Sequence, residues 1–255
     1  MTVCRDPLKQ DAGRSRKARG HSSQPLLHMF SSIPRRYDLL NRLLTGGLDT
    51  WWRKQAAEEC LRHASGPVLD LCCGTGDLSI RLANVSGGGR HVIGIDFSGP
   101  MLEEAVSKLR ARRLQRRIGF VRGDVGELPF EDACFSVIGI SFAFRNLTYQ
   151  NPLSSQYLSE VIRVLSPGGR FVLVETSRPP NALLRAAVDA YYALVVSRLG
   201  GMVSGHPDAY RYLAESARRF YTSEEVCGIL LDAGFRQVDS RPLLGGVAAL
   251  HVALK

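Results

Sequence analysis

Short apolar runs that alternate with segments of helical periodicity limit the fold of this chain more than any other feature. The apolar runs lie at residues 67–72, 91–96, 118–124, 136–144 and 168–176. Segments with helical spacing lie between them at residues 77–85, 99–112 and 152–165. This alternation predicts a parallel sheet with helices on both faces and a ligand site at the carboxyl ends of the strands.

The two ends of the chain depart from this alternation. Residues 33–64 have apolar positions at helical spacing that Gly46 and Gly47 interrupt, which predicts two helices. A helical insertion is expected at about residues 181–220, and residues 236–255 are typical of two closing strands. We therefore predict a doubly wound α/β fold with a mostly parallel seven-stranded sheet, an antiparallel C-terminal edge strand and extra helices.

The length and charge of the chain favour one domain with a basic leader. The chain has 255 residues, of which 45% are hydrophobic, and this is enough for a single large core. The net charge is +9, part of which lies at residues 14–21. We assign residues 1–28 to a disordered leader and residues 29–255 to one domain. The leader is either a solvated tail or a segment that holds the protein near anionic lipid or nucleic acid.

Neither an export signal nor a membrane-spanning helix is expected. The leader lacks the apolar centre of a signal peptide. The longest apolar helical stretch, residues 186–201, contains Asp189 and Arg198 and is too short to cross a bilayer. We therefore expect a cytoplasmic protein that can still touch the inner face of the membrane.

The cysteines are expected to be reduced and to bind no metal. No two of them have a C-x-x-C spacing, and no set of histidines lies near them. They are Cys4, Cys60, Cys72, Cys73, Cys134 and Cys227. Cys72 and Cys73 come just before a glycine turn, where small side chains that pack are the ordinary interpretation.

The sequence VLDLCCGTGD at residues 68–77 predicts a buried strand that runs into this glycine turn. Gly74 and Gly76 match the start of a dinucleotide-binding fingerprint, but Ser79 stands where that fingerprint has its third glycine. The glycines alone are therefore weak evidence for a nucleotide site.

Acids near the ends of successive predicted strands strengthen that evidence. Asp70 precedes the turn, Asp96 ends the next strand, and Asp124 ends the strand after it. Asp96 is placed to accept hydrogen bonds from ribose hydroxyls, and Asp124 could accept one from an adenine amino group. Any one of these acids alone would be typical of a helix cap or a turn.

The acids around the turn disfavour a cofactor that carries phosphate. Helix N-termini attract phosphate groups, but Asp70 and Asp77 flank this one and would repel them. S-adenosylmethionine carries an ammonium, a sulfonium and an adenosine but no phosphate. We therefore predict S-adenosylmethionine as the cofactor.

Further motifs extend along the chain and are specific when taken together. They are YDLLNRLLTGGLDTWWRK, GIDFSGPMLEEA, GDVGELPFEDACFSV, FAFRNL, RVLSPGGRFVLVETSRP, AYRYLAESARRF and GGVAALH. With the glycine turn, they resemble the C-methyltransferases of demethylmenaquinone and ubiquinone biosynthesis, which are class I S-adenosylmethionine-dependent enzymes. The resemblance covers about residue 30 to the end, and the ETSRP and ESARRF segments are more similar to the menaquinone branch.

The resemblance implies a role for each of several residues. It implies that the cofactor site includes Thr75, Asp96, Asp124, Val125 and Ser141, beside the turn residues Asp70, Gly74 and Gly76. It places Arg145 and Asn146 near the methyl acceptor. Tyr37 and Asn41 share one face of a predicted helix and are candidates for a lid over the site.

Some residues depart from the family pattern. Ala143 and Phe144 stand in FAFRN where the family has F-G-L-R-N, and we expect them to add bulk beside the acceptor pocket. Cys72 replaces the first glycine of the general D-x-G-x-G-x-G loop, and we expect it to shift that loop.

The implied reaction is methylation of a ring carbon of a prenylated hydroquinone. Demethylmenaquinol is the expected acceptor, and a polyprenyl benzoquinol is the alternative. Arg145 would stabilise the phenolate as a fixed cation, and Asn146 would orient the hydroxyl or a water. Arginine stays protonated, so we do not expect it to act as the base.

Two other classes of function compete with this interpretation. Amino-group methyltransferases of RNA or DNA carry an N/D-P-P-aromatic motif where this chain has FRNLTYQNPL, and no Pro-Cys dipeptide of a ring-carbon pyrimidine enzyme occurs. We therefore expect no nucleic acid partner. A non-catalytic nucleotide-binding protein would keep the fold, but it would not need Arg145 and Asn146.

A polyprenyl acceptor is insoluble in water, so the enzyme must meet it at a membrane or in an apolar groove. The insertion offers apolar residues at helical spacing, and the leader is basic. We hypothesise peripheral membrane contact through these two segments.

Overall fold

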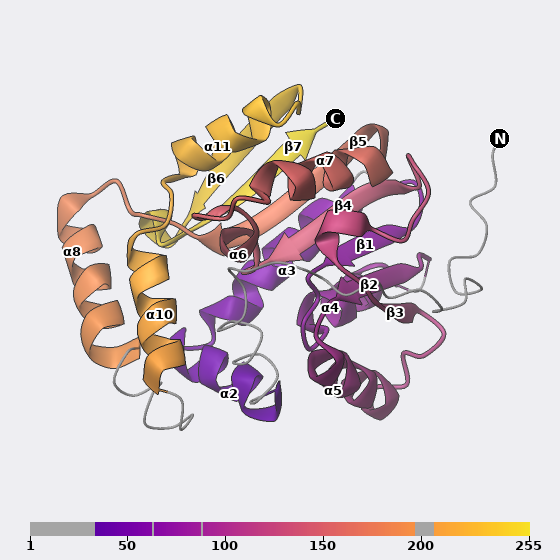
Figure 1. The fold of residues 1–255 in the computed structure, drawn as a ribbon. Coiled ribbons are helices and arrows are strands. Elements are labelled where there is room, and N and C mark those ends of the chain that lie inside the picture. The colour runs from indigo at the N-terminus through magenta and orange to yellow at the C-terminus, as the bar shows by residue number, and fades with distance from the viewer. Residues whose placement is uncertain (1–33, 63, 88, 197–206) are drawn as a thin grey trace.

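The computed structural model describes residues 34–62, 64–87, 89–196 and 207–255. The leader expected at residues 1–28 lies outside them, as does Cys4. The described chain forms a central sheet with helices on both faces, and two further helices stand to one side (Figure 1).

The central sheet has seven strands in the order β3-β2-β1-β4-β5-β7-β6. The strands are β1 (Val68–Leu71), β2 (Val92–Asp96), β3 (Ile118–Arg122), β4 (Phe135–Ser141), β5 (Leu165–Thr176), β6 (Gln237–Leu243) and β7 (Ala248–Leu254). Strands β1 to β5 pair in parallel, whereas β7 runs antiparallel to both β5 and β6. The predicted doubly wound, mostly parallel sheet is confirmed. The antiparallel strand, β7, lies one place inside the edge, which β6 forms.

The helices surround this sheet as the sequence pattern predicts. They are α2 (Pro34–Leu44), α3 (Leu48–Arg62), α4 (Asp77–Val85), α5 (Gly99–Ala111), α6 (Phe144–Thr148), α7 (Ser154–Val164), α8 (Ala182–Tyr191), α10 (Pro207–Arg218) and α11 (Ser223–Asp232). Short turns of helix add η2 (Val125–Glu127), η3 (Tyr192–Val196) and η4 (Leu244–Gly246). Helices α3, α4 and α5 cover one face, and α7 and α11 cover the other (Figure 1).

Side chains that alternate along the strands build a separate apolar core on each face. In β5, Phe171 and Leu173 point into the core beneath α7 and α11, whereas Val172 and Val174 point into the core beneath α3 and α4. This alternation is the ordinary consequence of a pleated strand that is buried on both faces. The two cores hold the strand ends in place, and the candidate site lies at those ends.

Local backbone conformation accounts for two boundaries. Gly46 and Gly47 have positive φ angles of 59° and 81°, and they separate α2 from α3 as expected. The apolar run at residues 136–144 is not one strand, because β4 ends at Ser141 and α6 begins at Phe144. Phe142, which lies between them, has a φ of 56°, which a strand cannot contain.

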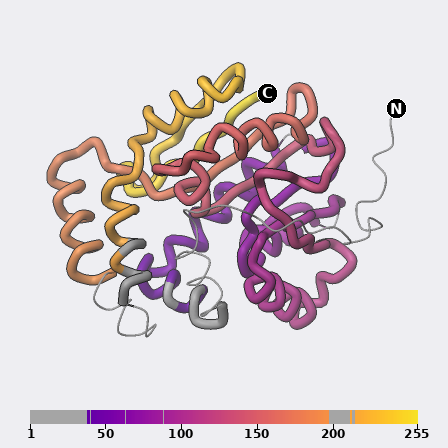
Figure 2. Tube along the Cα trace, in the orientation of Figure 1, coloured from indigo at the N-terminus to yellow at the C-terminus, as the bar shows by residue number. Residues whose placement is uncertain are grey.

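The insertion after β5 leaves the sheet as α8 and returns as α10 (Figure 2). Both helices lie within the predicted range of about 181–220. Residues 197–206, which precede α10, are not among the described residues. The η3 segment contacts both α8 and α10, so the described parts of the insertion pack together. No helix in the described residues is long and apolar enough to cross a bilayer.

The closing strand β7 contains a buried histidine that joins it to α11. His251 is 1% exposed, and its Nε2 lies 3.0 Å from the Ser223 hydroxyl and 3.3 Å from the Ser223 carbonyl oxygen. Its Nδ1 has no partner within the described part of the chain. Burial lowers the pKa of His251 to about 4, although the Ser223 contact opposes this change.

This histidine should make the stability of the fold depend on pH. The unfolded chain takes up a proton on His251 near pH 6.5, whereas the folded protein accepts it only near pH 4. The contribution to stability is therefore present above pH 6.5 and is lost as the pH falls towards 4. We expect the free energy of unfolding to decrease by up to about 3 kcal/mol across this range.

Urea unfolding of the wild type and of His251→Gln at a series of pH values measures this effect. Glutamine can still hydrogen-bond to Ser223 but cannot be protonated, so the variant should lose less stability between pH 6.5 and 4. Groups other than His251 titrate in both proteins, and the difference between the two curves cancels them. Parallel curves would contradict the assignment.

Candidate active site

The predicted site residues come together because three neighbouring strands end at the same level. Leu71 of β1 pairs with Ile95 of β2 on one side and with Ile140 of β4 on the other. The glycine turn follows β1, Asp96 ends β2, and Ser141 ends β4. Ser141 is half-buried there. The carboxyl ends of these parallel strands therefore form one edge, as the sequence predicts.

Backbone conformations that favour glycine shape the turn after β1. Gly74 and Gly76 have φ angles of 52° and 79°. A Cβ on Gly76 would lie 2.9 Å from the Phe120 ring, whereas a Cβ on Gly74 would meet nothing within 4 Å. The open space at Gly74 lets a ligand approach the backbone closely. Cys72, at the position of the first glycine in the general D-x-G-x-G-x-G loop, keeps a φ of 53°, which costs about 1–2 kcal/mol.

Asp96 fastens this turn to the end of β2. One of its carboxylate oxygens accepts a 2.8 Å hydrogen bond from the Gly74 N–H, and the other accepts one of 2.9 Å from the Ser98 N–H. The side chain is only 8% exposed. Burial raises the pKa of Asp96, and the two backbone N–H groups oppose that rise. Asp96 thus orders the turn that follows β1.

Asp70 lies beneath the turn and not at its open side. It is 1% exposed, and one of its oxygens accepts a 2.5 Å hydrogen bond from the Ser79 hydroxyl of α4. The other oxygen has no partner among the described residues. Burial raises the pKa of Asp70 to about 7, although the bond from Ser79 opposes this rise. Asp70 therefore acts on the turn through α4.

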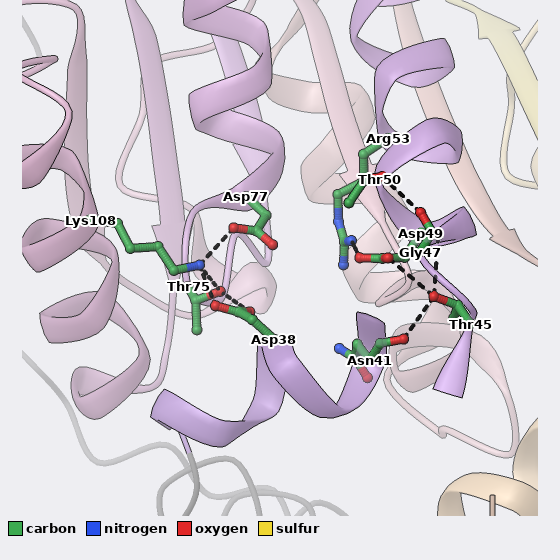
Figure 3. Close-up of polar contacts among 10 residues, drawn as sticks. All are labelled: Asp38, Asn41, Thr45, Gly47, Asp49, Thr50, Arg53, Thr75, Asp77 and Lys108. Carbon is green, nitrogen blue, oxygen red and sulfur yellow. Dashed lines mark hydrogen bonds and ion pairs between the residues drawn. The ribbon is translucent and has the colours of Figure 1, made fainter. Parts of the chain in front are cut away.

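An ion-pair cluster joins the glycine turn to the N-terminal helix α2 (Figure 3). The Lys108 ammonium of α5 contacts Asp38 of α2 and lies 2.6 Å from an oxygen of Asp77. It also donates to the Thr75 hydroxyl at 2.9 Å, and that hydroxyl donates to Asp38 at 2.7 Å. Burial would raise the pKa of Asp77, but the nearby cations, Lys108 foremost, together outweigh it and the pKa is lowered. Lys108 thus docks α2 onto the turn.

The rest of the expected lid contributes less to this cluster. Tyr37 belongs to α2, but its side chain lies outside the described residues. Asn41 is half-buried, and its backbone carbonyl oxygen accepts a 2.7 Å hydrogen bond from the Thr45 hydroxyl. Asp38 is the α2 residue whose described side chain contacts Thr75 of the turn and Lys108.

A buried arginine on α3 supplies a second cation near the turn. Arg53 is 8% exposed and binds Asp49 at 2.5 Å. Its guanidinium also lies 4.9 Å from the centre of the Phe142 ring. After burial and Lys108, Arg53 is the next influence on the pKa of Asp77, which it lowers. An arginine so placed could bind the carboxylate of the methionine part of the cofactor.

Arg145, on α6, stands at the same edge of the sheet and is 6% exposed. Its backbone N–H donates to a Glu175 oxygen at 3.2 Å, and its Nη1 donates to the Thr176 hydroxyl at 3.2 Å. Its buried Nε has no partner in the described chain. Asn146 is half-buried, and its backbone carbonyl oxygen accepts a 3.0 Å hydrogen bond from the Asn151 side chain. Arg145 is thus a buried cation with donors to spare.

The structure corrects the expectation for Phe144. Its side chain is completely buried in the core, with its ring centre 6.3 Å from that of Phe171, so it adds no bulk to a pocket. Ala143 precedes α6 and is half-buried. Phe142, which the sequence did not single out, is the aromatic residue that contacts Arg53. The expectation failed because the strand ends earlier than its apolar run.

Asp124 and Val125 lie at the start of η2, after β3 has ended. Asp124 is exposed, and one of its oxygens accepts a 2.8 Å hydrogen bond from the Gly126 N–H. Val125 is 7% exposed and belongs to the core beneath α7. Asp124 therefore caps a turn of helix and leaves its second oxygen for other partners.

Sequence reasoning missed both cations beside the turn. Lys108 is one of several basic residues near the end of α5, and nothing in its local pattern distinguishes it. The only available signal was indirect, because Asp38 and Asp77 need a cation if both lie near one turn. Arg53 belonged to a motif but was assigned no role. In the described residues no group of acids, cysteines and histidines is suited to hold a metal.

A surface groove of about 340 Å³ lies away from these residues. Residues of α3, β5, β6 and β7 line it, among them Arg62, Arg170 and Arg241. Arg62 pairs with Glu59 at 2.8 Å, and Arg241 donates to Gln55 at 3.1 Å. The groove contains none of the predicted site residues.

Replacing Asp96 with alanine should separate cofactor binding from folding. The variant removes the carboxylate that orders Gly74, so we expect the dissociation constant for S-adenosylmethionine to rise at least about tenfold. The melting temperature should fall by only a few degrees, roughly 4–8 °C, because the Gly74 and Ser98 N–H groups lose one acceptor. Calorimetric titration and thermal unfolding measure both quantities. Glu103→Ala, which removes an exposed acid of α5, is the control. Wild-type affinity in Asp96→Ala would contradict the site.

Comparison with known proteins assigns the chain to a family. The sequence profile of the ubiE/COQ5 methyltransferase family matches residues 18–255, so the match begins within the expected leader. A demethylmenaquinone methyltransferase from Thermus thermophilus is 43% identical over 88% of this chain and 98% of its own length. A ubiquinone/menaquinone biosynthesis C-methyltransferase UbiE from Azotobacter vinelandii is 35% identical over 96% of this chain and 94% of its own length.

A solved structure shares the fold. It is a SAM-dependent methyltransferase from Aquifex aeolicus, with a TM-score of 0.58 and 17% identity over 90% of this chain and 97% of that one. The predicted fold, the methyltransferase activity and the cofactor S-adenosylmethionine are confirmed by these comparisons. The chain is a member of the ubiE/COQ5 methyltransferase family.

Proposed function

We propose that this protein transfers a methyl group from S-adenosylmethionine to a ring carbon of demethylmenaquinol. The observation that carries the proposal is Arg145, a buried cation at the strand edge that also holds the glycine turn. Its Nε has no partner among the described residues. Methylation of a phenolic ring needs a fixed positive charge beside the oxygen, because the ring carbon becomes nucleophilic as that oxygen loses its proton.

The residues around the glycine turn fit S-adenosylmethionine. The open space at Gly74 permits close approach, and Asp96 offers a carboxylate for ribose hydroxyls. The acid Asp77 beside the turn suits its positive charges, and Arg53 suits its carboxylate. We propose that these residues hold the cofactor, with Asp124, Val125 and Ser141 along its nucleoside. The bound cofactor supplies an electrophilic methyl group.

The chain's own residues then prepare the acceptor. A phenol has a pKa of about 10 in water, so its ionisation at neutral pH needs help. Arg145, which is itself buried, lowers the free energy of the phenolate through its charge and its N–H donors. Asn146 has both a donor and an acceptor in its amide, so it can orient the hydroxyl or the water that removes the proton.

The naphthoquinol is favoured over a benzoquinol by sequence similarity. Identity to the Thermus demethylmenaquinone enzyme is 43%, against 35% for the Azotobacter enzyme whose name covers both quinones. The ETSRP segment, which is more similar to the menaquinone branch, also favours the naphthoquinol. Its Thr176 contacts Arg145. A polyprenyl benzoquinol remains the alternative acceptor.

Methyl transfer from labelled S-adenosylmethionine tests the proposed reaction. Reduced demethylmenaquinone, a polyprenyl benzoquinol and bulk RNA are offered in parallel, in detergent. We expect label on the naphthoquinol, with less than about one tenth of that rate on the benzoquinol and none on RNA. Arg145→Lys keeps the charge but loses the planar set of donors, so it should be at least about tenfold slower.

The outcomes of this assay separate the alternatives. Label on the benzoquinol alone would favour the ubiquinone branch. Label on neither quinol, from a protein that still binds S-adenosylmethionine, would contradict the proposed acceptor.

We also propose that the insertion meets the membrane that holds the acceptor. Helix α8 has no buried residue, and Leu183 is 83% exposed, while Leu194 of η3 is 55% exposed. On α2, Leu39 and Leu43 are 58% and 63% exposed. The Tyr191 hydroxyl donates to the Leu44 carbonyl oxygen, which brings the two helices together. Exposed leucines on adjacent helices favour an apolar contact with lipid.

Partition between buffer and liposomes tests this contact. The double variant Leu183→Glu, Leu194→Glu should lower the fraction bound to vesicles that contain anionic lipid by at least about threefold. Each change replaces an apolar side chain that would be buried in the lipid upon binding. Leu231→Glu, on the exposed side of α11, is the matched control. Equal binding by both proteins and the wild type would contradict the contact.

A further inference from the structure

The contacts that fix the Arg145 guanidinium involve residues to which no role has been assigned. The backbone N–H of Arg145 donates to Glu175, and one nitrogen of its guanidinium donates to the next residue, Thr176. Both acceptors lie at the end of β5. A cation that must meet one oxygen of an acceptor gains from such a fixed orientation. Two attachment points on one strand end restrict both the helix α6 and the side chain.

Glu175 is the rigid part of this arrangement. It is 1% exposed, and its two oxygens accept separate sets of hydrogen bonds. One oxygen accepts from the Arg145 N–H at 3.2 Å, and the other accepts from the Thr176 N–H at 2.9 Å and the Thr176 hydroxyl at 3.1 Å. A buried carboxylate needs such partners, and two backbone N–H groups and one hydroxyl supply them here.

Thr176 transmits the orientation to the guanidinium. A hydroxyl has one proton and two lone pairs. Because the Thr176 proton goes to Glu175, its lone pairs are free to accept, and one of them accepts from Arg145 Nη1 at 3.2 Å. The carboxylate therefore fixes the hydroxyl, and the hydroxyl fixes the arginine.

Tyr192 reaches the same group from the insertion. Its phenol interacts electrostatically with Arg145 and Glu175 and through a hydrogen bond with the Thr176 side chain. Burial raises the pKa of Tyr192 to about 12, so this phenol stays protonated and can donate. The insertion thus contributes a residue to the acceptor half of the site.

We propose that Glu175, Thr176 and Tyr192 are positioning residues that orient Arg145. Its Nε, which has no partner in the described part of the chain, then meets the oxygen of the bound acceptor. This inference rests on the proposed acceptor. None of the three residues needs to touch the acceptor, and each acts through the guanidinium. Inside the protein an unpartnered N–H is costly, so an acceptor oxygen that reaches it gains a strong bond.

Thr176→Val and Thr176→Ser test the proposal. Valine keeps the volume and removes the hydroxyl, whereas serine keeps the hydroxyl. We expect kcat and kcat/KM for demethylmenaquinol to fall together by about tenfold or more in Thr176→Val, and by less than about threefold in Thr176→Ser. The dissociation constant for S-adenosylmethionine and the melting temperature should change little in either. Substitution of Glu175 is less useful, because it leaves buried N–H groups unpaired and endangers folding.

Tyr192→Phe tests whether the insertion helps to orient Arg145. Alone it should lower kcat, and in the Thr176→Val background it should have a clearly smaller effect, because both hydroxyls act on one guanidinium. Fold-changes that multiply would show that Tyr192 acts independently, which would contradict its part in the proposal.

The wild type in the same assay separates this inference from the proposed function. A wild type that binds S-adenosylmethionine but does not methylate demethylmenaquinol would overturn the proposed acceptor. A wild type that is active, with Thr176→Val equally active, would overturn only the positioning role. An equal loss in Thr176→Val and Thr176→Ser would also overturn it, because serine retains the hydroxyl.

Discussion

The Asp96 carboxylate joins the end of one strand to the turn that follows its neighbour, and the cofactor half of the site depends on these hydrogen bonds. Asp96 accepts from Gly74 on one oxygen and from Ser98 on the other. The turn must approach a ligand closely, so it cannot be stabilised by packing on its open side. A buried acid at an adjacent strand end supplies the needed order without occupying that side. Asp70 does the same from beneath, through Ser79.

The two halves of the site are built by the same means on neighbouring strands. At the end of β2 an acid orders the turn proposed to bind the cofactor, and at the end of β5 Glu175 orders the arginine proposed to meet the acceptor. Segments outside the sheet complete both halves. Asp38 of α2 binds Lys108 beside the turn, and Tyr192 of the insertion lies near Arg145. The sheet thus fixes the residues proposed for both halves of the site, and the added helices contribute further contacts to them.

Much of the fold follows from the sequence, because strand and helix periods are local properties. The strands, the break at Gly46 and Gly47 and the insertion could all be predicted from it. The place of β7 between β5 and β6 could not, since it depends on long-range pairing. The site divides in the same way. Acids at strand ends are visible in the pattern, whereas Lys108 and Arg53 become meaningful only when distant helices bring them to the turn.

A crystal structure with S-adenosylhomocysteine bound would test the central claim most directly. The account predicts that the ribose hydroxyls contact the Asp96 carboxylate, that the amino acid part lies along the glycine turn, and that the sulfur faces Arg145. It also predicts that Lys108 keeps its contacts with Asp38 and Asp77. A nucleoside bound away from Asp96, or a sulfur turned away from Arg145, would contradict the proposed division of the site into cofactor and acceptor halves.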